Sequence, residues 1–206
     1  VRIEALAAKL EEVQKLRESI LKDSQDLCRA ILFNSPDSNI SLIPMRDLVR
    51  LRDPDVEVSP TETYNFAGVY SFGNGVFRSL TKQGIEFSYT KLTRICEGNF
   101  VYPKLMAWEG ALGTVPPECD GCVVSPEFPV FEVNENIILP ETLDVYFRTP
   151  FVWNKVAGLS TGTNVRRRRL HPSNFLKFEM PVPAMSIQQR LRQVRQKTNK
   201  LSALEN

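Results

Sequence analysis

The stretch RIEALAAKLEEVQKLRESILKDSQDLCRAILF, residues 2–33, decides the fold of this 206-residue chain. Its apolar side chains recur at steps of three and four, at Ile3, Leu6, Leu10, Val13, Ile20, Leu27 and Ile31. Arg17 and Ser24 interrupt this series, and Asn34-Ser35-Pro36 ends it. The spacing predicts a helix about 45 Å long with one apolar face. Residues 1–33 carry six basic and six acidic side chains, which is typical of a helix that packs lengthwise against another helix and not of a basic DNA-binding arm.

A second helix is predicted at the other end, over residues 184–206. Pro181 and Pro183 end the segment before it, and residues 186–189 (SIQQ) have the form of a capping box. The same spacing then recurs at Ile187, Leu191, Val194, Thr198 and Leu201. Five Lys or Arg against one Glu give this segment a net charge of +4. The two helices can pair with each other, with a second copy of the chain, or with another protein, and the sequence leaves these three arrangements open.

Between the helices, residues 37–183 contain short apolar runs that are broken by Gly, Pro, Asn and Ser. Strands are predicted at residues 48–51, 68–72, 123–124 and 130–133, with a turn at residues 72–76. Residues 143–153 predict a short helix that is broken at Pro150. We expect an α+β fold, in which one loop-rich mixed α/β domain is flanked by two long heptad-patterned helices that form a coiled-coil spacer.

The composition and the missing motifs exclude several classes of function. No apolar run is long enough to span a bilayer and no N-terminal signal pattern is present, so membrane and secretory proteins are set aside. The chain has a single histidine, His171, and no GxSxG, P-loop, GxGxxG or HExxH motif. We therefore expect a protein that is not an enzyme and that has no cofactor.

The four cysteines indicate a reducing, cytoplasmic location, because they do not form a disulfide framework. Cys119 and Cys122 form a CxxC, but a closed zinc site needs a second pair of ligands, which is missing. The surrounding run PPECDGC, residues 116–122, has the residue types of a turn. We expect a turn with ordinary thiols and no metal site.

The net charge of +2 conceals an uneven distribution. Residues 118–144 carry seven carboxylates and no Lys or Arg, whereas residues 145–183 carry seven Lys or Arg and one Glu. Within the basic part, a small polar loop precedes four consecutive arginines. Guanidinium groups suit phosphate oxygens and guanine edges, and Thr and Asn suit phosphate contacts. The first candidates for DNA binding are Thr161, Thr163, Asn164, Arg166, Arg167 and Arg168. A basic surface strand is the alternative explanation.

Two other segments supply weaker candidates. Asn74 and Arg78 lie in YSFGNGVFR, residues 70–78, and their side chains are of the types that read adenine and guanine edges. An ordinary turn uses the same residue types. Lys104 and Glu109 are the charged members of the otherwise apolar residues 100–110, and we expect them to point outward.

Six stretches follow one another in a characteristic order. They are RIEALAAKL, GVYSFGNGVF, FVYPKLMAWEGALG, VSPEFPVFEV, STGTNVRRRRL and MPVPAMSIQQRL. This order resembles the specificity subunit of a type I restriction–modification system, over essentially the whole chain. The most telling parts are the basic segment at 160–170 and the Pro-x-Pro plus Gln at 181–191. The resemblance implies a spacer helix at 1–36, a target recognition domain at 37–183 and a distal helix at 184–206.

Such subunits are non-catalytic and recognise split sites in double-stranded DNA, to which they direct the methyltransferase (modification) and restriction subunits. They hold two recognition domains, whereas this chain matches one and begins at Val1 inside a heptad series. The resemblance therefore implies a half-subunit or a fragment. A half-subunit that forms a homodimer through its helices would read a two-fold symmetric split site. The alternative is a coiled-coil assembly protein whose globular domain binds another protein, with binding that survives high salt.

Overall fold

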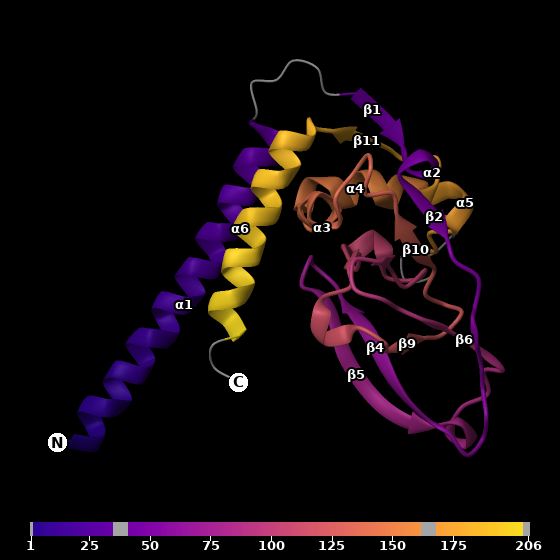
Figure 1. Ribbon diagram of the computed structural model, residues 1–206, viewed down its shortest axis with the longest axis horizontal. Coiled ribbons are helices and arrows are strands. Elements are labelled where there is room, and N and C mark those ends of the chain that lie inside the picture. The colour runs from indigo at the N-terminus through magenta and orange to yellow at the C-terminus, as the bar shows by residue number, and fades with distance from the viewer. Residues whose placement is uncertain (1, 35–40, 162–167, 204–206) are drawn as a thin grey trace.

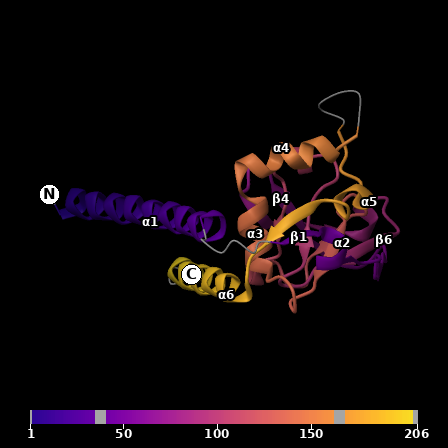
Figure 2. The same cartoon turned by 90° about the horizontal axis from the view of Figure 1, so that it is seen from above.

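Two long helices lie side by side along one edge of the molecule (Figure 1). They are α1 (Arg2–Phe33) and α6 (Met185–Ala203). They run in opposite directions, and α1 extends past the end of α6 in both views (Figures 1 and 2). The computed structural model describes residues 2–34, 41–161 and 168–203.

Between the two helices in sequence lies the central domain, which runs from β1 to β11. Its described α-helices are α2 (Met45–Leu48), α3 (Pro140–Phe147), α4 (Pro150–Leu159) and α5 (Pro172–Phe175). The described 3-10 turns are η1 (Gly84–Glu86), η2 (Ala107–Glu109) and η3 (Pro117–Cys119).

The described strands form three sheets. In the first, β1 (Ser41–Pro44) pairs with β11 (Glu179–Val182). The second has the order β2 (Val49–Leu51), β10 (Val130–Val133), β7 (Phe100–Val101) and β8 (Gly113–Thr114). The third has the order β3 (Val56–Glu57), β6 (Lys91–Arg94), β9 (Val123–Val124), β4 (Thr63–Tyr70) and β5 (Gly75–Gln83). These elements form the mixed α/β domain that the sequence predicts.

The second sheet separates two parts of the hydrophobic core. In the β7–β10 pair, Phe100 lies opposite Phe131, and Val101 lies opposite Val130. Successive side chains of a strand point to opposite faces. The two phenylalanines therefore pack with the helices in the largest core cluster. The two valines pack in a second cluster with residues of the third sheet and of η3, and we call the third sheet together with η3 the β-rich lobe. The β7–β10 pair thus contributes side chains to both core clusters, one on each of its faces.

The face of α1 that packs against the molecule differs from the predicted apolar face. Cys28 is buried against the central domain, and the Ser24 hydroxyl lies 2.6 Å from that of Thr198 on α6. Ile20 and Leu27 remain 48% and 50% exposed. An α-helix drifts by about 20° per seven residues relative to a strict heptad repeat. Over four turns this drift moves Ile20 and Leu27 to the side, so that Ser24, an apparent interruption, faces α6.

The beginning of α1 keeps an uncovered apolar face. Ile3, Leu6, Leu10 and Val13 are 83%, 59%, 65% and 52% exposed. The N-terminal part of α1 extends past the end of α6 (Figure 1). We call these four residues the α1 apolar face.

Two predicted strands have different limits in the structure. The strand predicted at 48–51 begins at Val49, because Leu48 ends the single turn of α2. The amide of Met45, the first residue of α2, donates to the carbonyl of Phe178 (2.8 Å). This distant partner helps to hold a helical turn that local residue types do not indicate.

The strand predicted at 68–72 overlaps only the end of β4, which runs from Thr63 to Tyr70. Ser71 and Phe72 belong to the turn that follows, and Phe72 has a backbone φ of +61°. A left-handed backbone at Phe72 cannot continue a strand. The predicted turn between two strands is confirmed, and it joins β4 to β5.

The predicted helix break at Pro150 is confirmed, since α3 ends at Phe147 and α4 begins at Pro150. Proline suits the first position of a helix because that position needs no amide donor. The predicted capping box at 186–189 is wrong. The helix α6 begins at Met185, and the amides of Ile187 and Gln188 already donate to the Ala184 carbonyl.

Candidate nucleic-acid interface

The segment at residues 104–110 contacts two other candidate segments that are far from it in the sequence. The carbonyl of Lys104 accepts a hydrogen bond from the amide of Leu170 (2.8 Å). Five residues further on, the carbonyl of Glu109 accepts from the amide of Phe72 (2.8 Å). Residues 168–170 therefore lie next to one end of the segment 104–110, and the turn between β4 and β5 lies next to its other end. We call this set of three segments the candidate surface.

At the Lys104 end of the candidate surface, two cations contact the loop before β10. The ammonium of Lys104 donates to the carbonyl of Pro126 (2.8 Å). Arg169 forms an ion pair with Glu127 at 2.6 Å. The expectation that Lys104 points outward is met only in part, because its side chain is half-buried and its ammonium is engaged with the backbone.

Thr161 and Arg169, which flank the undescribed residues 162–167, are joined by one pair of hydrogen bonds. The amide and carbonyl of Thr161 pair with the carbonyl and amide of Arg169, at 3.0 and 2.9 Å. Thr161 is exposed, and Arg168 is partly buried. The other four candidates of this segment, Thr163, Asn164, Arg166 and Arg167, lie outside the described residues.

At the Glu109 end, the candidate surface consists of a closed turn. The side-chain amide of Asn74 donates to the Ser71 carbonyl (3.0 Å), and the Ser71 hydroxyl donates to the Glu109 carboxylate (3.3 Å). Gly73 has a φ of +70°, and a Cβ there would approach the backbone of Arg148 to 2.8 Å. These contacts fix the turn, so that Asn74 is exposed on a rigid support.

Phe72 is a residue of this turn that sequence reasoning did not single out. Its side chain is 65% exposed, and it is the one non-glycine residue with a positive φ in the described ranges. A bulky side chain in the left-handed region is strained. The residues FGNG signal a turn, but they do not show which of them takes the strained position.

Arg78 lies apart from the other candidates. It is on β5, opposite Ala67 of β4, and beside η3. Burial raises the pKa of the Cys119 thiol and the neighbouring Cys122 and Glu118 add to the rise, to about 11 in all, while the Arg78 charge opposes it. Arg78 therefore adds positive charge to the η3 side of the lobe and not to the turn that holds Asn74.

The side chains of the candidate surface are suited to polar binding. Lys104, Arg168 and Arg169 supply cationic donors, while Asn74 and Glu109 supply amide and carboxylate groups on loops. Loop side chains that a rigid domain supports are the usual means of base recognition. The imidazole of His171 accepts from the Ser173 amide and caps α5, so its ring has a structural partner.

The CxxC lies at the end of η3, as the turn interpretation predicts. Cys119 and Cys122 are buried free thiols. Across residues 2–34, 41–161 and 168–203, no group of three or more His, Cys, Asp or Glu is arranged to hold a metal ion. In the same ranges, no helix combines the length and the hydrophobicity of a membrane span.

Two solved structures share this fold. The HsdS subunit from Thermoanaerobacter tengcongensis matches with a TM-score of 0.56 and 20% identity, over 82% of this chain and 42% of that chain. A structure that concerns complex assembly and conformational transition of the type I R-M system matches with a TM-score of 0.58 and 16% identity. That match covers 79% of this chain and 42% of that one. This chain therefore spans less than half the length of either.

The likeness shows the fold, in which a long N-terminal helix and a C-terminal helix flank a mixed α/β domain. It covers most of this chain. No protein-family model matches the sequence, and no curated protein resembles it closely enough to count as a match.

Proposed function

We propose that this chain recognises double-stranded DNA as the specificity subunit, or half-subunit, of a type I restriction–modification complex. It is non-catalytic and directs methyltransferase and restriction subunits to a split site. Residues 37–183 form the target recognition domain, and the helices at 1–36 and 184–206 form the spacer. The fold shared with the HsdS subunit supports this role.

The single observation that carries the proposal is the joining of the three candidate segments along residues 104–110. Segments with polar residues that are far apart in the sequence are adjacent through the backbone hydrogen bonds of Lys104 and Glu109, which supports one shared surface. In this proposal Arg168 and Lys104 contact phosphates, and Asn74 and Glu109 contact base edges. The remaining candidates are Thr161, Thr163, Asn164, Arg166, Arg167 and Arg78.

The α1 apolar face indicates how two half-sites come to be read together. Four apolar side chains on one face of a helix, each more than half exposed, are typical of a surface that another helix covers. A second copy of the chain presents the same surface, and a two-fold dimer would read a symmetric split site. We propose this homodimer as the form of the half-subunit.

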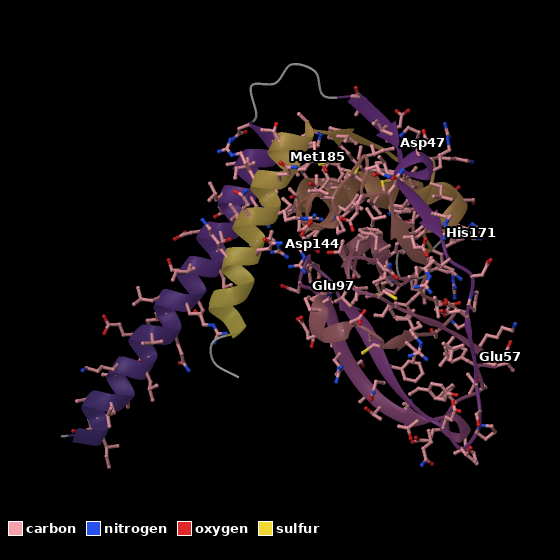
Figure 3. The ribbon with its side chains drawn as sticks, in the orientation of Figure 1. Asp47, Glu57, Glu97, Asp144, His171 and Met185 are labelled. Carbon is pink, nitrogen blue, oxygen red and sulfur yellow. The ribbon has the colours of Figure 1, made fainter. Side chains whose placement is uncertain are left out.

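The decisive experiment is a selection from a randomised duplex pool, with the chain co-expressed with its modification subunit. Enrichment of a split motif with a fixed gap is expected. Binding of the selected duplex should weaken steeply as the salt concentration rises. Arg168→Ala should reduce the slope of the logarithm of the binding constant against the logarithm of the salt concentration by about one. Lys91→Ala is a matched control, because Lys91 pairs with Glu57 at the far end of the domain (Figure 3).

The α1 apolar face also favours a second candidate function, which is a coiled-coil assembly protein whose central domain binds another protein. In that case no motif is enriched, and partner binding survives both high salt and nuclease treatment. The Arg168→Ala variant would then bind its partner as the parent chain does.

A further inference from the structure

A groove of about 680 Å³ lies where α6 meets the central domain. Charged side chains from both sides line it, among them Glu97, Glu135, Glu141, Asp144, Arg192 and Arg195. Figure 3 shows Asp144 between α6 and the domain. The side chain of Asp144 is only 2% exposed, which is unusual for a carboxylate.

Asp144 joins three parts of the molecule through its two oxygens. One oxygen lies 2.6 Å from the guanidinium of Arg195 on α6. The other lies 2.9 Å from Arg148, at the end of α3, and 3.3 Å from the amide of Thr114 on β8. A buried carboxylate is tolerated when opposite charges and donors surround it in this way.

Arg192 repeats the connection one turn earlier on α6. It forms ion pairs with Glu135 (2.8 Å) and Glu141 (2.9 Å) of the central domain. Arg192 and Arg195 are three residues apart, so they project from the same side of the helix. Two arginines of α6 thus reach three carboxylates of the domain.

Arg148 extends the connection to the candidate surface. A Cβ at Gly75 would overlap the guanidinium of Arg148, and one at Gly73 would meet its backbone. The guanidinium therefore lies directly against the turn between β4 and β5. A continuous series of contacts runs from α6 through Arg195, Asp144 and Arg148 to this turn.

We propose that Asp144 is a positioning residue, whose carboxylate locks α6 to the central domain and fixes the orientation of the candidate surface relative to the helical pair. Apolar contacts are non-directional and tolerate small rotations, whereas charge-assisted hydrogen bonds have fixed geometry. The first turns of α6 are held by the buried side chain of Leu191 and by the hydrogen bonds of Gln188, and the charged contacts of Arg192 and Arg195 set the angle of the helix beyond them.

The functional consequence rests on the proposed function. If each central domain reads one half-site, the angle between domain and helices sets the gap between the half-sites. A loosened junction would then accept several gap lengths while the half-site sequence stays the same.

The orientation is tested without DNA, by electron spin resonance distance measurement on the full chain. One nitroxide is placed on the exposed native Cys96 and the other on a cysteine at exposed Glu18 of α1. The parent chain should give one narrow distance distribution, and Asp144→Asn should broaden it. A distribution of unchanged width in a folded Asp144→Asn protein overturns the proposal.

Three further variants keep this test decisive. Arg195→Gln removes the same contact from the α6 side, where the side chain is 20% exposed, and it replaces Asp144→Asn if that variant fails to fold. It should broaden the distribution, and Arg195→Lys should partly restore the width. Leu92→Ala, in the distant lobe core, lowers stability and should leave the width unchanged.

The expected effect on the gap between half-sites is tested by a selection in which the half-site sequences are constant and the length of the gap varies. The parent complex should enrich one gap length, and Asp144→Asn several. If Asp144→Asn also enriches a single gap length, the contacts of Asp144 with α6 do not determine the distance between the half-sites. If the parent chain enriches no motif at all, the proposed function fails, and the distance measurement alone decides whether Asp144 fixes the orientation.

Discussion

Gln188 is a polar side chain in a buried position, and both ends of its amide have partners. Its oxygen accepts from the amide of Leu139 (2.8 Å), and its nitrogen donates to the carbonyls of Ile137 (3.0 Å) and Pro183 (2.9 Å). The bonds to Leu139 and Ile137 join the first turn of α6 to the chain before α3. Buried polar groups that lose their partners are costly, because water cannot replace them.

Gln188→Ala should therefore lower the free energy of unfolding by roughly 2–4 kcal/mol, since it leaves one amide and two carbonyls without a partner. Urea denaturation followed by circular dichroism measures this change. The neighbouring exposed residue gives the control, and Gln189→Ala should change the free energy of unfolding by less than about 0.5 kcal/mol. Equal effects of the two substitutions would contradict the anchoring role of Gln188.

Asp144 gives a prediction about pH. Burial acts to raise its pKa, but Arg148, Arg195 and the Thr114 amide together hold the pKa below the ordinary value of 3.8. A carboxyl whose pKa is lowered by folding stabilises the folded state above its unfolded pKa. That contribution is lost as the pH falls through the folded pKa.

The difference in unfolding free energy between the parent chain and Asp144→Asn should therefore be constant above about pH 5 and shrink below pH 3.8. Urea titrations from about pH 7 to about pH 2.5 measure it. A difference that stays constant down to the lowest pH would show that the Asp144 pKa is not lowered by folding.

At the scale of elements, the long helices were predictable because their signal is local. Apolar spacing of three and four residues places side chains on one face whatever the rest of the chain does. The packing face of α1 was not predictable in the same way. That face depends on where α6 and the domain contact the helix. Because an α-helix drifts relative to a heptad repeat, Ser24 and Cys28 lie on the packing face and Leu27 lies to its side.

The candidate surface shows the same limit. The residue types of Asn74, Lys104 and Arg168 pointed to polar binding one segment at a time. Their grouping depends on backbone hydrogen bonds between residues almost 40 and more than 60 positions apart, which no local pattern encodes. The lock at Asp144 left no local signal either, because its partner on α6 is 51 residues away.

The α1 apolar face allows a test of the proposed homodimer. Leu10→Lys should shift the chain from dimer to monomer, because it places a charge in the centre of the face. Stability should change little, since Leu10 is 65% exposed in the single chain. Sedimentation velocity over a range of concentrations measures the oligomeric state.

The control for that test is Ser19→Lys, which adds the same charge on the opposite side of α1 at an exposed position. It should leave the dimer intact. A parent chain that remains monomeric at the highest concentration would exclude a second copy as the partner of this face.

At the scale of the whole molecule, the domain consists of layers that share strands. Phe100 and Val101 of β7 contribute to different core clusters, and so do Val123 and Val124 of β9. Opening of either layer therefore removes the contacts on one face of a strand that the other layer also needs. Such sharing favours one cooperative unit that includes the ends of α1 and α6, because Cys28 and Leu191 belong to the largest cluster.

The native cysteines can test this cooperativity. Cys28 lies at the junction of α1 and the domain, Cys119 and Cys122 lie in the lobe, and each is at most 1% exposed. Cys96 is exposed, so a thiol reagent should modify it at once in the folded protein. The other three thiols should become reactive over the same range of urea concentration as the loss of helical circular dichroism.

Mass spectrometry of the labelled peptides identifies each site, and a Cys96→Ser chain removes the fast background. If Cys119 and Cys122 react at a lower urea concentration than Cys28, the lobe opens by itself, and the shared strands do not couple the layers. If all three react together, the helices and the candidate surface belong to one cooperative unit. A lock at Asp144 can then transmit the position of α6 to the turn that holds Asn74, because no part between them unfolds separately.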